Sequence, residues 1–268
     1  MNSLNESIVT QAICNEYFEK FKNHQDMDVA IIGAGPSGLT AAWKLARQDF
    51  KVGVFERNLA IGGGMWGGGM TWNIIVVQEE SKYVLEEAGV NLKRYQEGYY
   101  TADSIGATSA LALQASNSGA GIFNCMSVED VAIRQENGEK RINGIVINST
   151  PVERTGLHVD PLVLNCRYLI DCTGHSTEVV NTLVRKNDVE INTPTGKIEG
   201  EKSMWADIAE KTTVENTLEI FPGIYVAGMA ANACFGSYRM GPIFGGMLLS
   251  GEKVASDISQ RLQAKKQG

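Results

Sequence analysis

The chain has 268 residues, 43% of them hydrophobic, which allows a sizeable core in one large domain or two small ones. Its formal net charge of −7 and the lack of any Lys/Arg-rich run argue against nucleic acid as a partner. No apolar run approaches the roughly 18 residues that cross a bilayer, and the first residues lack a basic start followed by an apolar block. We therefore expect a cytoplasmic protein with no membrane partner.

The first part of the chain predicts a nucleotide-binding βαβ unit. Apolar residues recur at helical spacing over residues 6–21, which predicts a lead-in helix. The run MDVAIIGAG is then typical of a buried parallel strand, PSGLTAAWKLARQ of a helix with proline in its first turn, and KVGVFE of a second strand. Strand, glycine turn, helix and strand together form a βαβ unit over residues 28–57.

The remaining elements predict a single α/β domain. Residues 61–119 begin with the glycine-dense IGGGMWGGGM, and helical periodicity after it predicts an inserted, mostly helical segment. The stretch from IFNCMS to GIVINS predicts strands with a hairpin turn at Asn137-Gly138. CRYLIDCTG and GIYVAGM are typical of short strands, and residues 245–264 predict a C-terminal helix. Residues 1–268 should therefore form one domain with a Rossmann-like fold of the flavoprotein, glutathione-reductase-like type.

The turn after the first strand has the pattern of a dinucleotide site. Gly33, Gly35 and Gly38 satisfy G-x-G-x-x-G between a predicted strand and a predicted helix. Gly33 permits the tight turn, Gly35 lets backbone amides approach a pyrophosphate, and Gly38 permits close helix packing. Glu56 closes the next strand and can accept both ribose hydroxyls, which favours an adenosine with a free 2′-hydroxyl.

A flavin is a weaker prediction than the ADP half of the ligand. The pair ER followed by IGGG, and the strand GIYVAGM, resemble the flavoprotein subclass of this fold. However, Met229 stands where that subclass usually has an aspartate that contacts the flavin side chain. The departure argues against a flavin.

Three residues between positions 158 and 175 have the composition of a metal site. His158 and Asp160 lie two positions apart, so on extended backbone their side chains point the same way. His175 follows a strand, at the edge where ligands of open α/β sheets bind. Two imidazoles and one carboxylate are the ligands of a non-haem iron facial triad. The spacing fits equally a structure in which His158 caps a turn and Asp160 simply precedes Pro161.

Arg239 lies just before a glycine-rich entry to the last predicted helix. An arginine at this place can clamp a carboxylate bidentately beside a helix N-terminus. A structural ion pair with one of the 31 acidic residues is an equally good interpretation.

Five motifs together resemble the thiamine thiazole synthase family: GAGPSGLTAAW, ERNLAIGGGMWGGGM, HVDP, IDCTGH and RMGPIFGGM, in that order. The resemblance covers nearly all of residues 26–256. It implies an enzyme of the transferase class that takes NAD as substrate, releases nicotinamide and isomerises the ADP-ribose to a ketone. Glycine would condense with that ketone, and addition of sulfur and cyclisation would give an adenylated carboxythiazole, the thiazole precursor of thiamine.

The resemblance also implies a sulfur source, a metal and an assembly. In members of the family a cysteine two residues before the aspartate of the HVDP segment donates the sulfur, and this chain has His158 there. It therefore resembles the archaeal branch, in which sulfide is the donor and Fe(II) is required. Members form ring-shaped homo-octamers with the site at a subunit boundary.

Individual roles follow from the same resemblance. Asp160 and His175 match the iron ligands, so His158 becomes a neighbour and not a certain third ligand. Arg239 matches the group that holds the glycine carboxylate, and these four residues form the expected catalytic set. Further nucleotide contacts are matched by Ser37, Glu56, Arg57, Gly64, Val128, His158, Val159, Asp160 and Met229.

Three other functions compete with this one. A ribose-1,5-bisphosphate isomerase would share the ketose-forming step, but it needs a phosphate-binding basic cluster that the sequence does not offer. An FAD-dependent oxidoreductase is suggested by the fold alone. A nucleotide-binding module without chemistry would return NAD intact.

Overall fold

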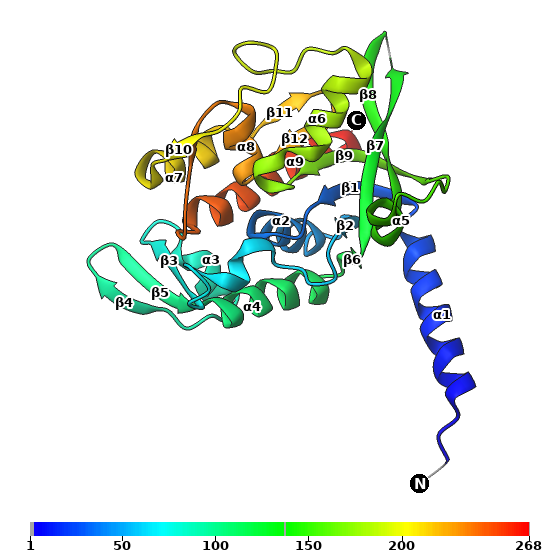
Figure 1. The fold of residues 1–268 in the computed structure, drawn as a ribbon, viewed down its shortest axis with the longest axis horizontal. Coiled ribbons are helices and arrows are strands. Elements are labelled where there is room, and N and C mark those ends of the chain that lie inside the picture. Colours follow the sequence, from blue (N-terminus) through cyan, green and yellow to red (C-terminus); the bar gives the residue numbers. More distant parts are fainter. Residues whose placement is uncertain (1–2, 137, 268) are drawn as a thin grey trace.

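The computed structural model describes residues 3–136 and 138–267, and Figure 1 labels its elements. The strands are Asp26–Ile32 (β1), Val52–Glu56 (β2), Ile74–Gln78 (β3), Lys93–Gln96 (β4), Tyr99–Asp103 (β5), Gly121–Asn124 (β6), Met126–Glu136 (β7), Glu139–Ser149 (β8), Leu162–Asp171 (β9), Lys202–Met204 (β10), Glu219–Phe221 (β11), Ile224–Val226 (β12) and Tyr238–Arg239 (β13). The helices are Glu6–Asn23 (α1), Pro36–Ala46 (α2), Lys82–Glu87 (α3), Ser104–Asn117 (α4), Thr150–Thr155 (α5), Glu178–Asn187 (α6), Ala206–Glu215 (α7), Met229–Cys234 (α8) and Gly245–Gln267 (α9). Two short 3₁₀ helices are Gly63–Gly67 (η1) and Gly174–Ser176 (η2).

The central sheet is built around β1. Its strands follow the order β11-β12-β9-β1-β2-β6, and every neighbouring pair from β12 to β6 is parallel. On β1, Val29 and Ile31 belong to one hydrophobic core, and Ala30 and Ile32 to the other. A strand covered on both faces is typical of parallel sheets in α/β proteins. The predicted Rossmann-like α/β fold and its βαβ unit are confirmed.

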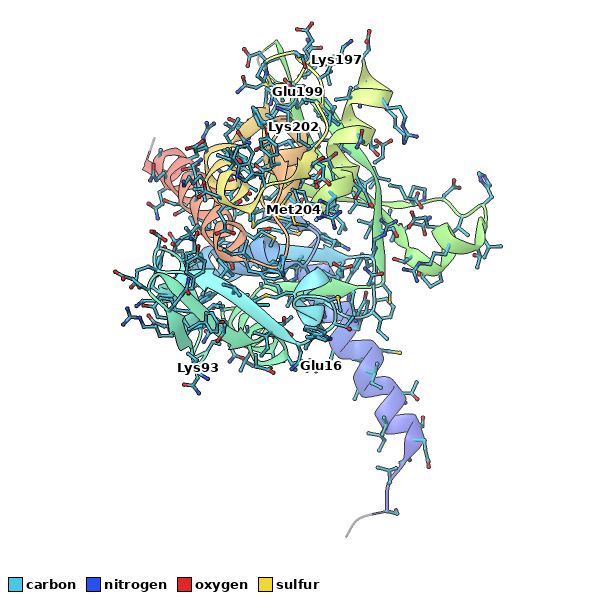
Figure 2. The ribbon with its side chains drawn as sticks, turned by 60° about the vertical axis from the view of Figure 1, so that its left-hand side comes forward. Glu16, Lys93, Lys197, Glu199, Lys202 and Met204 are labelled. Carbon is cyan, nitrogen blue, oxygen red and sulfur yellow. The ribbon has the colours of Figure 1, made fainter. Side chains whose placement is uncertain are left out.

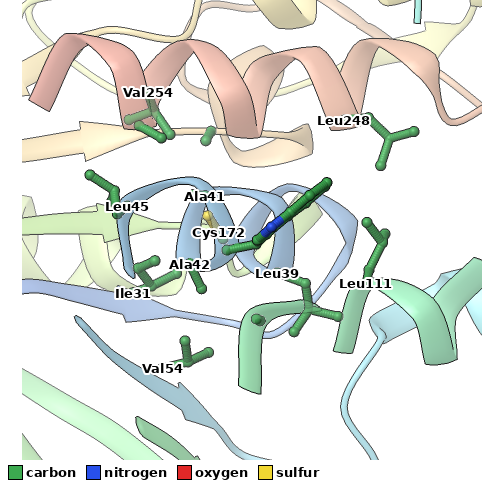
Figure 3. Close-up of a cluster of buried hydrophobic side chains, with 14 of the residues drawn as sticks. Ile31, Leu39, Ala41, Ala42, Leu45, Val54, Leu111, Cys172, Leu248 and Val254 are labelled. Carbon is green, nitrogen blue, oxygen red and sulfur yellow. The ribbon is translucent and has the colours of Figure 1, made fainter. Parts of the chain in front are cut away.

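Helix α2 lies between the sheet and α9. Figure 3 shows Ile31 and Val54 from the sheet on one side of α2, and Leu248 and Val254 from α9 on the other. The two helices approach closely at Gly251, where a Cβ would meet the carbonyl oxygen of Ser37 at 2.4 Å. The packing therefore holds the first turn of α2 against the C-terminal helix, which runs three residues beyond its predicted end.

The inserted segment contains more than helices. Helices α3 and α4 form in the predicted helical stretches, but β3, β4 and β5 form an antiparallel sheet in the order β3-β5-β4. The prediction of a mostly helical insertion missed this sheet. Its strands are four or five residues long, and every residue of β4 is exposed, so β4 shows no alternation of apolar and polar residues.

Two predicted elements lie at the edge of the molecule. Helix α1 is confirmed, but none of its residues is buried, and it projects away from the sheet (Figure 1). The β7–β8 hairpin is confirmed by antiparallel pairing, while Asn137 of its predicted turn lies outside the described residues. Within the described part of the chain, no helix is long and apolar enough to cross a membrane.

Candidate active site

A cavity of about 660 Å³ opens at the carboxyl ends of β1, β2 and β9, where ligands of open α/β sheets bind. Its wall comes from the turns after these strands, the glycine-rich loop around η1, the starts of β7 and α8, and the residues that lead into α9. Most of the predicted site residues line it: Gly33, Gly35, Ser37, Glu56, Arg57, Gly64, Val128, His175, Met229 and Arg239.

The three glycines of the turn after β1 meet different surroundings. Gly33 has a φ of +97°, and a Cβ there would meet the carbonyl oxygen of Cys172 at 2.4 Å. At Gly38 a Cβ would meet the carbonyl oxygen of Gly33 at 2.1 Å, so this residue serves packing and does not line the cavity. A Cβ at Gly35 would meet nothing within 4 Å. Gly35 therefore faces open space that a ligand can fill.

The Glu56 carboxylate is buried and holds the surrounding backbone. Its Oε2 accepts a hydrogen bond from the Ala34 N–H at 3.0 Å, which ties β2 to the glycine turn. Its Oε1 accepts from both the backbone N–H and the side-chain amide of Asn58, each at 2.8 Å. Asn58 lines the cavity as well, and sequence reasoning missed it because nothing in the local pattern distinguishes it from a surface turn residue.

Arg57 bridges two acidic side chains at the cavity wall. Its guanidinium pairs with Glu178 at the start of α6 and, at 3.4 Å, with Glu153 of α5. The Ser127 hydroxyl donates to Glu153 at 2.5 Å. Both glutamates line the cavity but were not predicted, because they come from elements distant in sequence and carry no local motif.

His175 reaches the cavity from a turn organised by a buried carboxylate. Asp171 accepts hydrogen bonds from the Thr173 N–H at 2.9 Å, the Thr173 hydroxyl at 2.6 Å and the Val180 N–H at 3.1 Å. Burial raises the pKa of Asp171, and these hydrogen bonds counteract the shift. The turn is completed by Gly174 at a φ of +76°. The Nδ1 atom of His175 lies 2.5 Å from Oε2 of Glu201, another residue that the sequence pattern did not indicate.

Arg239 lines the cavity from β13, which pairs with β10 in parallel. Its carbonyl oxygen accepts a hydrogen bond from the Trp205 N–H at 3.1 Å. Among the residues that the structure describes, no acidic side chain forms an ion pair with its guanidinium. The interpretation as a structural ion pair is therefore not supported, and the guanidinium is available to an anionic ligand.

The segment of residues 158–160 lies outside the cavity. His158, Val159 and Asp160 are all exposed in the loop between α5 and β9, where the Asn148 amide donates to the Val159 carbonyl at 3.1 Å. In the described ranges of the chain, no three His, Cys, Asp or Glu side chains are grouped so that they could hold a metal ion. The triad of His158, Asp160 and His175 suggested by spacing is thus not assembled within the described chain.

Apolar residues surround this exposed segment. Leu157, Val159, Leu162 and Val163 each expose at least half of their surface. Large apolar side chains exposed in one part of a chain are typical of an interaction surface. The loop therefore has the character of an interface and not of a cavity wall.

Comparison with known proteins gives full-length matches. The model of the Thi4 family matches residues 10–244. A thiamine thiazole synthase of Solidesulfovibrio magneticus is 67% identical over 261 residues, covering 97% of this chain and 99% of that protein. One of Methanothermobacter thermautotrophicus is 53% identical over 260 residues, with coverage of 97% and 99%. The crystal structure of Thermovibrio ammonificans THI4 superposes with a TM-score of 0.95 at 50% identity, covering 98% of this chain and 100% of that one.

Proposed function

This chain belongs to the Thi4 family and is a thiazole synthase, and we propose that it converts NAD, glycine and sulfide to an adenylated carboxythiazole with ferrous iron. One observation carries the proposal: a single cavity joins the glycine turn and Glu56 to His175 and to Arg239, whose guanidinium has no acidic partner among the described residues. A dinucleotide site alone would serve many enzymes. The added imidazole and guanidinium suit the condensation of an amino acid with a ketone derived from the ribose.

NAD would bind with its pyrophosphate at the first turn of α2, where backbone N–H groups lack helical partners. A carboxylate has about four acceptor sites, and Ala34 and Asn58 use three of those on Glu56. Glu56 can therefore accept one ribose hydroxyl as it stands, and a second hydroxyl would replace an Asn58 contact. Glu153 and Glu178 add negative charge to the same wall, which disfavours a 2′-phosphate.

Glycine would bind through its carboxylate to Arg239. The planar guanidinium offers two parallel N–H donors to a carboxylate. Glycine held in this way would keep its amine beside the carbonyl carbon that it attacks, which lowers the entropic cost of the condensation. The buried side chains of Met65, Met229 and Phe244 line the same cavity and would limit the access of water to the reacting atoms.

A metal fits this chain only in part. His175 reaches the cavity, whereas Asp160 is exposed and does not line it. We therefore propose that Asp160 meets the metal from a second copy of the chain. The exposed apolar residues that flank Asp160 support such an assembly, for which we propose the homo-octamer of the family. Bound iron would supply Lewis acidity toward oxygen and sulfur ligands.

The sulfur would come from sulfide in solution. The position that matches the family's sacrificial cysteine holds His158, and an imidazole has no sulfur to donate. We expect His158→Cys to make at most one product molecule per chain with sulfur from the protein, which mass spectrometry would detect as unlabelled product formed in the presence of isotopically labelled sulfide. Product sulfur that derives entirely from the added sulfide would contradict this expectation.

The decisive experiment is an anaerobic incubation with NAD, glycine, sulfide and Fe(II), followed by mass spectrometry of the small molecules. We expect an adenylated carboxythiazole that disappears when any one component is omitted. If the protein is folded and NAD is recovered intact after the incubation, the proposal is overturned. A visible spectrum of the purified protein with flavin absorption would favour the oxidoreductase, and turnover of a ribose bisphosphate would favour the isomerase.

A further inference from the structure

The carboxylate of Glu201 contacts the imidazole of His175. The carboxylate oxygen lies 2.5 Å from Nδ1, with 24% of the Glu201 side chain and 47% of the His175 side chain exposed. His175 lines the cavity and Glu201 does not. Glu201 therefore contacts the imidazole from outside the space that a ligand would occupy.

The backbone around Glu201 is firmly attached to the rest of the molecule. The N–H groups of Glu199, Gly200 and Lys202 donate to carbonyl oxygens of residues 233–237 at 3.1, 3.0 and 2.7 Å. Figure 2 shows Glu199, Lys202 and Met204 following one another along this segment. The segment continues into β10, and Met204 pairs with Arg239 in β13. Glu201 thus directly precedes the strand that pairs with Arg239.

The chemistry of the two groups determines which ring nitrogen carries the proton. An ionised carboxylate can only accept hydrogen bonds. Nδ1 of a neutral His175 must then be the donor, which leaves the lone pair on Nε2. Within the described chain, no protein group forms a hydrogen bond with Nε2. A carboxylate on the second nitrogen is also the arrangement that orients a metal-bound histidine and raises its basicity.

We propose that Glu201 is a positioning residue that holds His175 as the Nδ1–H tautomer and keeps its Nε2 lone pair free for a cation in the cavity. The identity of that cation as a divalent metal rests on the proposed function, whereas the tautomer does not. The competing interpretation is a purely structural link between η2 and the segment of residues 199–202. Such a link would also fix the tautomer, but its loss would leave the affinity for a metal unchanged.

The first test measures the tautomer in metal-free protein. The chain has three histidines, so ¹⁵N-histidine labelling gives a simple spectrum, and His175→Gln assigns the signal. At a pH where the ring is neutral, we expect the Nδ1–H form in the wild type and in Glu199→Gln, an exposed carboxylate on the same segment. Glu201→Ala should shift the ring toward the Nε2–H form that free histidine side chains favour. An unchanged tautomer in folded Glu201→Ala would overturn the proposal.

The second test titrates ferrous ion alone into the protein under anaerobic conditions. Glu201→Gln should weaken binding about 10- to 100-fold, as expected for loss of an orienting carboxylate, and Glu199→Gln should bind like the wild type. Equal affinity of Glu201→Gln and wild type would contradict the role toward the metal. A wild type that binds no ferrous ion would count against the proposed function, while the tautomer measurement would still decide the role of Glu201.

Discussion

The glycine turn after β1 and the loop of residues 158–160 are both predicted to contact the nucleotide, yet only the turn lies in the cavity of its own chain. The turn is completed by neighbours in the βαβ unit: Gly38 packs on Gly33, and Glu56 binds the Ala34 N–H. The loop has one described side-chain contact of this kind, from Asn148 to Val159, and exposes its apolar residues. The difference indicates that a motif confined to one supersecondary unit can form its part of the cavity alone, whereas the exposed loop contributes nothing to the cavity of its own chain.

The sharpest test of this difference is subunit complementation. Asp160→Ala and His175→Ala should each lower thiazole formation roughly 1,000-fold, because loss of a metal ligand removes several kcal/mol of stabilisation. If Asp160 acts in a neighbouring copy, a mixture refolded together should regain activity at about a quarter of its sites, since each site then draws its two ligands from different chains. Mixtures that stay as inactive as the single variants would show that both ligands must belong to one chain.

Substitutions in the glycine turn should separate its role in packing from its role in ligand binding. Gly38→Ala forces a Cβ to 2.1 Å from the Gly33 carbonyl, and overpacking of this kind costs about 3 kcal/mol. Gly35→Ala meets open space and should leave the free energy of unfolding within about 0.5 kcal/mol of the wild type, while weakening NAD binding. Denaturant titration and calorimetric NAD titration check the pair. Equal stability of the two variants would contradict the packing role of Gly38.

Substitution of Arg239 should weaken the binding of glycine and leave the binding of NAD unchanged. Arg239→Lys keeps the positive charge but loses the bidentate geometry, and we expect the KM for glycine to rise about 10- to 100-fold. The affinity for NAD should be unchanged, because Glu56 and the glycine turn hold the other part of the ligand. Steady-state kinetics with each substrate varied in turn provides the measurement. A parallel loss of NAD affinity would mean that Arg239 supports the whole cavity instead.

The smallest expected effect concerns Glu210 of α7, whose Oε2 accepts a hydrogen bond from the Gly246 N–H at 2.8 Å at the start of α9. Burial raises its pKa to about 7, with the Gly246 hydrogen bond opposing and Glu80 reinforcing the shift. A carboxyl whose pKa is higher in the folded state stabilises the fold below its unfolded pKa, and this contribution is lost as the pH rises through about 7. The free energy of unfolding of the wild type should therefore fall by roughly 2 kcal/mol between pH 5 and pH 7 because of this group.

Glu210→Gln removes the titrating group and keeps an oxygen acceptor for Gly246. Its free energy of unfolding, measured by denaturant titration between pH 5 and pH 8, should lack that part of the pH dependence. Parallel pH profiles of the variant and the wild type would contradict a raised pKa. Because α9 begins beside the cavity, the same comparison shows how the Glu210–Gly246 hydrogen bond contributes to the stability of that wall.

Sequence reasoning identified the parts of the site that depend on local geometry. A buried strand, a glycine turn and a helix in succession predict where Gly33, Gly35 and Gly38 lie, because each residue's surroundings come from the same thirty-residue unit. His175 and Arg239 were found through their place after a strand and before a helix. The three-stranded sheet in residues 61–119 was missed because its strands are short and, in β4, fully exposed.

The local order of residues thus determined the fold class and the glycine turn, because hydrophobic periodicity and glycine spacing act over a few residues, while the candidate catalytic side chains came from the resemblance of five short motifs. Only the tertiary structure decided which side chains meet. It paired Glu201 with His175 across 26 positions and Arg57 with Glu178 across 121 positions. It also left Asp160 outside the cavity despite its nearness to His175 in sequence. Such contacts depend on how the strands order themselves in the sheet, and that order is set by packing over the whole chain and not by spacing along it.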